Sequence, residues 1–331
     1  MDRLIELIDE KQNPSVVGLD PTEQVVPPQL MTAFTAEAQA ELDSLAGSDV
    51  DPDAVAEATE VVATGNAAAY FEFNRAVIDA VADIVPAVKP QIAMYEALGP
   101  AGLDAYAMTC EYAQQRGLYV IGDIKRGDIG STATAYAAHL TDDQWHEDAV
   151  TVNPYLGSDG IEPFLAAATD RDKDLFALVR TSNPSGSQVQ ELELAGGERV
   201  YEKIADLVEQ WGAGSAGRYG YSRIGAVVGA THRDEGRALR ARMPHTFFLV
   251  PGYGAQGGTA ADVAGMFDRD GSGIVVNSSR GIIGAWTTSD HADELLGDDS
   301  SATVDDALDA VITSARLAAK AMRDDLRAVM P

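Results

Sequence analysis

The chain has 331 residues, of which 46% are hydrophobic, so it can bury one large core or two modest ones and lacks the composition of a disordered protein. The sequence has 24 Lys and Arg and 52 Asp and Glu, which give a net charge of -28. This charge argues against nucleic acid and anionic membrane surfaces as partners, and any anionic ligand requires a local cationic pocket. The single Cys110 excludes an intrachain disulfide, and because the sequence has neither a signal-like N-terminus nor an apolar run of membrane-spanning length, we expect a cytoplasmic protein.

Short apolar runs rich in β-branched residues recur along the chain and predict strands. Each run ends in polar or glycine-rich residues, and most are followed by a segment of helical period. In chain order the runs span residues 15–20, 86–95, 118–125, 149–157, 175–183, 224–231, 246–254 and 273–281. Continuous apolar strands are typical of a parallel sheet covered by helices, so eight such units predict the α/β class and a (β/α)8 TIM barrel.

The chain is longer than the roughly 250 residues that such a barrel usually needs. Residues 30–66 are rich in alanine and acidic side chains, and they predict one or two surface helices inserted after the first strand. A helix over 67–84 then follows. Residues 185–200 form a long connection after the fifth strand, which indicates a lid or a binding loop. Because no linker divides the sequence, we expect a single barrel domain over 1–331 that contains the 30–66 insertion.

The stretch "DIKRGDIGST", residues 123–132, concentrates charge at the end of the third strand. Functional residues of a TIM barrel lie at the carboxyl ends of its strands. Because a strand has a period of two, Asp123 and Lys125 should point to the same face. Asp128 lies beyond the strand, where it could face a second subunit, and Arg126 is expected to be solvated.

Two further charges lie at strand positions. Lys89 is embedded in the apolar run "PAVKPQIAMY", where a buried lysine is rare unless it is paired, and Asp20 ends the first strand. A salt bridge that merely terminates a strand remains an alternative for the isolated Asp123 and Lys125 pair. The addition of Lys89 and Asp20 favours a pocket lined by alternating acids and bases, in which an ammonium group could stabilise and protonate a carbanion.

The turn "PGYGAQGG", residues 251–258, matches the G-x-G-x-x-G pattern of dinucleotide-binding folds. That fingerprint belongs early in a doubly wound sheet with an acid at the end of the next strand, whereas this one follows the seventh strand and the next strand leads to Arg280. Loops after strands seven and eight of a TIM barrel often bind phosphate. The pattern therefore predicts a phosphate site, with ordinary glycine-rich turns as the alternative.

No metal site is expected. The five histidines, at positions 139, 146, 232, 245 and 291, are scattered without a metal-binding motif. Residues 268–273 resemble part of a calcium loop but lack its third acid and its closing glutamate, so a turn between a helix and a strand is the better interpretation.

The motifs together resemble the orotidine 5'-phosphate decarboxylase family. "DIKRGDI" matches the family signature D-x-K-x-x-D-I, and the longer bacterial branch of the family is similar to "VVGLDP", "VKPQIAMYEALGPAG", "VNPYLGSDG", "RTSNPS" and "PGYGAQGG". The likeness runs from about residue 15 to residue 284. It implies cofactor-free decarboxylation of orotidine 5'-phosphate to UMP, the last step of de novo pyrimidine biosynthesis. It also implies a homodimer with shared active sites.

The resemblance implies a charged tetrad of Lys89, Asp123, Lys125 and Asp128, with Asp128 supplied by the partner subunit. Lys125 would donate the proton to C6 of the pyrimidine, and Asp123 would lie near the departing carboxylate. The implied substrate contacts divide by the part of the nucleotide that they touch. The ribose would meet Asp20 and Lys89, with Ile129 and Thr132 from the partner. The ring would meet Ser182 and Pro251, and the phosphate would meet Gln256, Arg280 and Gly281.

Three other functions stay open at this point. A metal-dependent sugar-phosphate decarboxylase or aldolase of the same barrel group would share the D-x-K motif. A catalytically silent nucleotide-phosphate sensor is disfavoured, because it has no need for a carboxylate aimed at an anionic ligand. An NADP-binding protein would rest only on the glycine pattern and Arg280.

Overall fold

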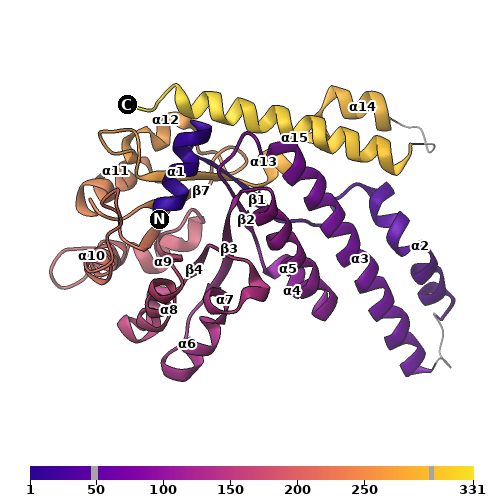
Figure 1. Ribbon diagram of the computed structural model, residues 1–331, viewed down its shortest axis with the longest axis horizontal. Coiled ribbons are helices and arrows are strands. Elements are labelled where there is room, and N and C mark those ends of the chain that lie inside the picture. The colour runs from indigo at the N-terminus through magenta and orange to yellow at the C-terminus, as the bar shows by residue number, and fades with distance from the viewer. Residues whose placement is uncertain (46–50, 298–301) are drawn as a thin grey trace.

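Residues 1–45, 51–297 and 302–331 are described by a computed structural model, and within them eight parallel strands close into a barrel in sequence order (Figure 1). The strands are β1 (Ser15–Leu19), β2 (Ala87–Pro90), β3 (Tyr119–Arg126), β4 (Ala149–Val152), β5 (Asp174–Arg180), β6 (Ile224–Val228), β7 (Phe248–Pro251) and β8 (Ile274–Ser278). Pairing of β1 with both β2 and β8 closes the ring. The predicted barrel and the place of each strand in the sequence are confirmed.

The barrel interior is filled by one side chain or two from each strand. These inward residues are Val16, Ala87, Tyr119, Ile121, Ala149, Phe176, Val227, Leu249 and Val275. They occupy alternate positions because successive strand side chains point to opposite faces. Helix α1 (Asp2–Lys11) covers the amino end of the barrel and packs Leu4, Ile5 and Ile8 into the same cluster. The amino end of the barrel is therefore closed. Polar side chains that follow on the inward faces of the strands lie at the carboxyl end.

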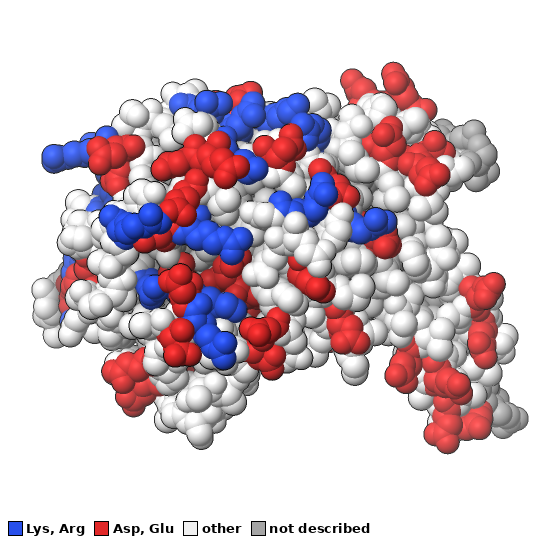
Figure 2. Space-filling model, in the orientation of Figure 1, with Lys and Arg blue, Asp and Glu red and all other residues white. Residues whose placement is uncertain are grey.

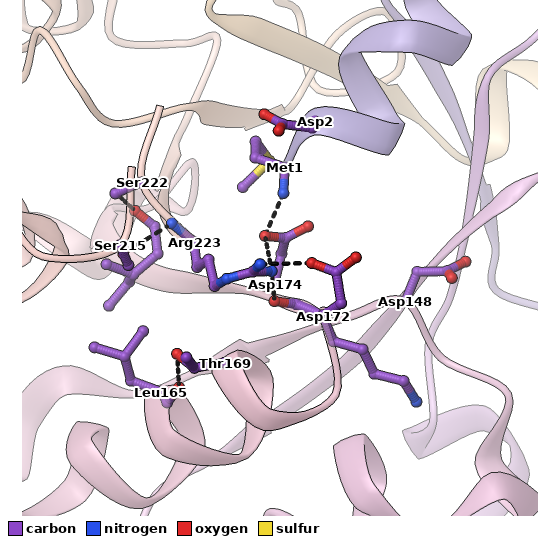
Figure 3. A network of polar contacts seen from close by, with 12 residues as sticks. Met1, Asp2, Asp148, Leu165, Thr169, Asp172, Asp174, Ser215, Ser222 and Arg223 are labelled. Carbon is purple, nitrogen blue, oxygen red and sulfur yellow. Dashed lines mark hydrogen bonds and ion pairs between the residues drawn. The ribbon is translucent and has the colours of Figure 1, made fainter. Parts of the chain in front are cut away.

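A polar network ties the strands together at the amino end (Figure 3). The amino group of Met1 pairs with the Asp174 carboxylate, which also accepts a hydrogen bond of 2.7 Å from the Tyr119 hydroxyl. Arg223 pairs with Asp172 at 2.5 Å and lies 4.0 Å from Asp174. Burial raises the pKa of Asp174 although the neighbouring ammonium group opposes this shift. This network lies at the end of the barrel opposite to the predicted site.

Helices form the outer layer around the strands (Figure 1). They are α2 (Pro28–Ser44), α3 (Pro52–Val81), α4 (Ala93–Glu96), α5 (Gly99–Gln115), α6 (Gly130–Tyr136), α7 (Ala138–Thr141), α8 (Ser158–Asp170), α9 (Ser187–Gln190), α10 (Val200–Gly212), α11 (Arg233–Arg242), α12 (Ala260–Val263), α13 (Arg280–Ile283), α14 (Asp290–Leu296) and α15 (Val304–Arg327). Short 3-10 turns include η2 (Pro154–Leu156) and η3 (Pro184–Gly186). None of the helices in the described ranges combines the length and the apolar character that crossing a bilayer requires.

Helices α2 and α3 form a hairpin that projects beyond the barrel (Figure 1). The sequence predicts a helical boundary between the 30–66 insertion and the 67–84 helix, but α3 runs without a break through that point. Gly65 lies inside α3, and a Cβ atom there would come within 2.3 Å of the Phe34 carbonyl oxygen of α2. Close packing of the two helices thus explains the glycine inside α3. Acidic side chains gather on the outer tip of this hairpin (Figure 2).

The long connection after β5 contains regular structure. Turn η3 and helix α9 follow each other directly, and an isolated bridge joins Glu193 to Arg199 before α10 begins. Three large apolar side chains of this connection are exposed, namely Val189, Leu192 and Leu194. The connection is therefore an ordered cover near the carboxyl end of β5.

Candidate active site

A cavity of about 510 Å³ opens at the carboxyl ends of the strands. Its lining is mostly polar, and its apolar members are Leu178, Val227, Leu249 and Pro251. The polar lining consists of Asp20, Lys89, Gln91, Asp123, Lys125, Thr151, Thr181, Ser182, Asn183, Gln190, Gln256, Asn277 and Ser279. A size of this order suits a small organic ligand with a few fixed polar contacts.

The centre of the cavity is a carboxylate held between two ammonium groups. Lys89 Nζ lies 2.5 Å from Asp123 Oδ2, and Lys125 Nζ lies 2.6 Å from Asp123 Oδ1. Lys89 and Asp123 are buried, whereas the Lys125 side chain is 46% exposed. The three groups together carry one net positive charge, and the accessible ammonium of Lys125 faces the space that a ligand would fill.

An irregularity of β3 sets the direction of Lys125. The register between β3 and β4 shifts between Gly122 and Arg126, and Lys125 has a φ of 45°. A bulky residue rarely adopts this left-handed backbone, and it persists where surrounding contacts enforce it. The Thr151 hydroxyl of β4 supplies such contacts, because it accepts a hydrogen bond of 3.0 Å from the Lys125 amide and donates one of 2.9 Å to Asp123 Oδ1.

The two buried charges shift each other's pKa. Burial alone would raise the pKa of Asp123, but the adjacent Lys89 and Lys125 ammonium groups outweigh it and hold that pKa well below its usual range. Burial alone would lower the pKa of Lys89, but Asp123 and Asp20 attract its charge and leave that pKa raised. Both groups are therefore ionised throughout the neutral range.

Replacing Asp123 with asparagine should destabilise the protein by about 3 kcal/mol at neutral pH, because it leaves the buried Lys89 charge without its partner. Since the folded-state pKa of Asp123 is depressed, its contribution is present above the ordinary value of 3.8 and is lost as the pH falls through the folded-state value. Denaturant unfolding of both proteins between pH 7 and pH 3 checks this. The gap in unfolding free energy should begin to narrow below about pH 3.8.

The exposed Asp9 of α1 provides the control for this measurement. Asp9→Asn should change the unfolding free energy by less than about 0.5 kcal/mol at every pH. If the difference in unfolding free energy between wild type and Asp123→Asn stays constant down to pH 3, the ionised carboxylate is not what stabilises the fold.

Two contacts of Asp123 were not anticipated from the sequence. Gln91 Nε2 donates to Asp123 Oδ2 at 3.0 Å, and Thr151 donates to Asp123 Oδ1. Gln91 stands two residues after Lys89, so the period of a strand could have placed it on the same face. Thr151 is the polar residue within the apolar strand β4, which is also a readable signal.

The predicted site residues fall into two groups. The cavity brings together Asp20, Lys89, Asp123, Lys125, Ser182, Pro251 and Gln256. The structure places Asp128, Ile129, Thr132, Arg280 and Gly281 outside the lining of their own chain's cavity. The first three lie in the segment after β3, and the last two directly follow Ser279, which does line the cavity.

The expectation for Arg126 is wrong. Its side chain is only 23% exposed and pairs with Glu96, and its guanidinium lies 5.6 Å from the centre of the Tyr136 ring. The contacts with Glu96 of α4 and Tyr136 of α6 hold this side chain against the flanking helices, so it does not extend into solvent.

The glycine-rich turn after β7 adopts a backbone that glycine favours. Gly252, Gly254 and Gly257 have φ values of 100°, 73° and 93°, and Gly258 donates from its amide to the Gly252 carbonyl at 3.0 Å. The helix that follows, α12, has only four residues. A tight loop before a single helical turn in a closed barrel does not match the dinucleotide-binding unit, so this pattern gives no support to the NADP alternative.

Within the described part of the chain, no three His, Cys, Asp or Glu side chains are grouped so that they could hold a metal ion.

Known proteins resemble this chain over most of its length. Residues 30–295 match the sequence model of the orotidine 5'-phosphate decarboxylase / HUMPS family. An orotidine 5'-phosphate decarboxylase of Clostridium acetobutylicum is 43% identical over 259 residues, which are 78% of this chain and 85% of that protein. One from Clostridium perfringens is 41% identical over 285 residues, which are 86% of this chain and 88% of that protein.

A solved structure extends the comparison to the whole fold. The OMP decarboxylase of Leishmania donovani superimposes with a TM-score of 0.70 at 27% identity, and the alignment covers 99% of this chain and 97% of that one. The match with the family spans most of the sequence, and the closed barrel agrees with the solved fold. The chain therefore belongs to the orotidine 5'-phosphate decarboxylase / HUMPS family.

Proposed function

We propose that this protein decarboxylates orotidine 5'-phosphate to UMP in pyrimidine biosynthesis. The observation that carries the proposal is the Asp123 carboxylate between Lys89 and Lys125 at the mouth of the barrel. Membership of the family supports the substrate, since the relatives that match most of the chain are named for this reaction. The exposed Lys125 ammonium in the cavity and the Arg280 guanidinium that directly follows the cavity residue Ser279 supply the local positive charge that an anionic nucleotide needs in a protein of net charge -28.

The reaction proposed for this centre uses only the charges and one proton of the protein's side chains. The carbon–carbon bond between C6 of the pyrimidine and its carboxyl group breaks, CO2 leaves, and the electron pair remains on C6. The Lys125 ammonium stabilises that pair and then transfers its proton to C6. Two unit charges 4 Å apart interact by about 4 kcal/mol at an effective dielectric near 20, so a fixed ammonium group lowers the barrier substantially.

Asp123 has two roles in this proposal. Its contacts with Lys89, Lys125 and Gln91 fix the direction of the Lys125 amine before substrate arrives. Its negative charge also faces the substrate carboxylate, so the repulsion between them is relieved when CO2 departs. The same group therefore positions the proton donor and favours loss of the leaving group.

The remaining cavity residues are assigned to different parts of the nucleotide. We assign the ribose hydroxyls to Asp20 and Lys89 and the pyrimidine to Ser182 and Pro251, all of which line the cavity. We assign the phosphate to Gln256 with Arg280 and the Gly281 amide at the rim. Binding energy from the phosphate end would then order the loops over the ring.

We further propose a homodimer in which Asp128, Ile129 and Thr132 complete the partner's site. Large apolar side chains are exposed beside these residues, which single chains seldom leave uncovered in a cluster. They are Ile129, Tyr136, Tyr155 and Leu156, with exposed fractions of 50%, 39%, 82% and 46%. They lie on the segments that follow β3 and β4, next to the mouth of the cavity.

An absorbance assay for loss of orotidine 5'-phosphate in excess chelator tests the reaction. We expect turnover to stay within about twofold of the rate without chelator, because the proposed steps use only side chains. The rival sugar-phosphate decarboxylase or aldolase should lose its activity in chelator. Absence of turnover with this nucleotide under either condition would contradict the proposed function.

A further inference from the structure

Arg180 at the end of β5 is a buried cation that the reaction does not use. Its side chain is 2% exposed, and its guanidinium lies 5.5 Å from the centre of the Tyr201 ring. It pairs with Glu191 and donates to Gln190 Oε1 at 3.3 Å, both from the segment that covers the cavity. A buried charge is costly unless several partners compensate it, so the position calls for a role.

The same guanidinium also reaches the turn after β6. Its Nη2 atom lies 3.2 Å from His232 Nδ1 and 3.7 Å from Glu235. Because arginine can only donate, His232 Nδ1 must be the acceptor, and the neutral ring then carries its proton on Nε2. That nitrogen donates to the Thr181 carbonyl at 3.0 Å. Arg180 and His232 together thus join the loop after β5 to the turn after β6.

These contacts converge on the residues that bound the substrate cavity. Gln190 Oε1 accepts from the Thr181 amide at 3.1 Å, and Gln190 Nε2 donates to the Thr181 hydroxyl at 2.6 Å. The next residue, Ser182, packs against Gly229 in the turn after β6, where an added Cβ atom would come within 2.8 Å of the Ser182 backbone. The backbone of Ser182 is therefore held in place by its close contact with this turn.

We propose that Arg180 is a positioning residue for the reaction. Its guanidinium group binds Gln190 and Glu191 on one side and His232 of the turn after β6 on the other, and thereby fixes Ser182 and Gln190 at the cavity wall. Movement during substrate binding is then confined to the residues between Ser182 and Gln190. The inference rests on the proposed role of Ser182 in reading the pyrimidine.

The test uses Arg180→Lys, which keeps the charge but removes the fork that reaches both segments. We expect kcat/KM for orotidine 5'-phosphate to fall by at least about tenfold, since small misplacement of binding groups has effects of this size. Hydrogen exchange measured by mass spectrometry should become faster in residues 181–195, with the rest of the barrel unchanged. Affinity for UMP should fall with kcat/KM.

Arg240 offers a matched control. It too is buried, and it donates to the carbonyl groups of Gly273 and Thr246, away from the cavity. Arg240→Lys should lower the melting temperature yet leave kcat/KM of the folded enzyme within about twofold. Equal effects of the two variants on kcat/KM, or faster exchange at 181–195 with unchanged kcat/KM, would overturn the proposal. Because exchange is measured without substrate, that readout stays separate from failure of the proposed reaction.

Discussion

Lys125→Ala should reduce turnover of orotidine 5'-phosphate by at least about 10⁴-fold, because it removes both the charge that stabilises the C6 carbanion and the proton that quenches it. Affinity for UMP should stay within about tenfold of wild type, since the residues assigned to phosphate and ring are untouched. Single-turnover kinetics and UMP titration measure the two quantities separately. Turnover close to wild type would contradict the assignment of the proton donor.

Arg280→Ala should affect substrate binding, in contrast to Lys125→Ala, which should affect the chemical step. Arg280 directly follows Ser279, which lines the cavity, but is not itself part of the lining that contains Asp123 and Lys125. Its loss should raise KM by at least about tenfold, as expected for a charge-assisted contact to phosphate. An unchanged KM would exclude Arg280 from phosphate binding and leave the role of Lys125 intact.

The sequence could predict the barrel because each of its strands contains an apolar run. A parallel strand covered on both faces leaves a continuous hydrophobic run, and each of the eight runs became a strand. The runs were read as longer than the strands, since β2 ends at Pro90 and α4 begins at Ala93. The charged residues Lys89, Asp123 and Lys125 lie near the carboxyl ends of β2 and β3, which is where the chemistry of this fold is expected.

The charged centre was predictable for the same geometric reason. Strand period placed Asp123 beside Lys125, and the apolar surroundings of Lys89 required a buried partner. The positive φ of Lys125 and the register shift between β3 and β4 go together with contacts to β4, which is distant in sequence. Such tertiary contacts leave no local pattern, and this is also why Arg126 was assigned to solvent.

The role of Arg180 could not be anticipated from the sequence, because its partners come from three separate segments. Gln190 and Glu191 follow it by about ten residues, Tyr201 lies on α10, and His232 lies after β6. The continuity of α3 was hidden for a similar reason, since the packing of Gly65 against α2 is visible only once the hairpin has formed.

Mixing two inactive variants should restore activity if the active sites are shared. Asp128→Ala is expected to lose at least about 10²-fold in kcat, because a charge of the catalytic tetrad is removed from the partner's site. When Asp128→Ala and Lys125→Ala chains exchange at equal amounts, half of the dimers are hybrids. Each hybrid has one site with both substitutions and one with neither, so recovery should approach about a quarter of wild-type activity.

This recovery discriminates between the possible arrangements of Asp128. If the carboxylate acted within its own chain, every site in the mixture would keep one substitution, and no activity would return. The position of Asp128 outside the lining of its own cavity favours the shared arrangement, and the exposed Ile129 and Tyr155 beside it provide apolar surface for the contact. Sedimentation analysis of the same samples shows whether dimers form. A dimer that gives no recovery would show that Asp128 acts within its own chain, which would contradict the shared active site.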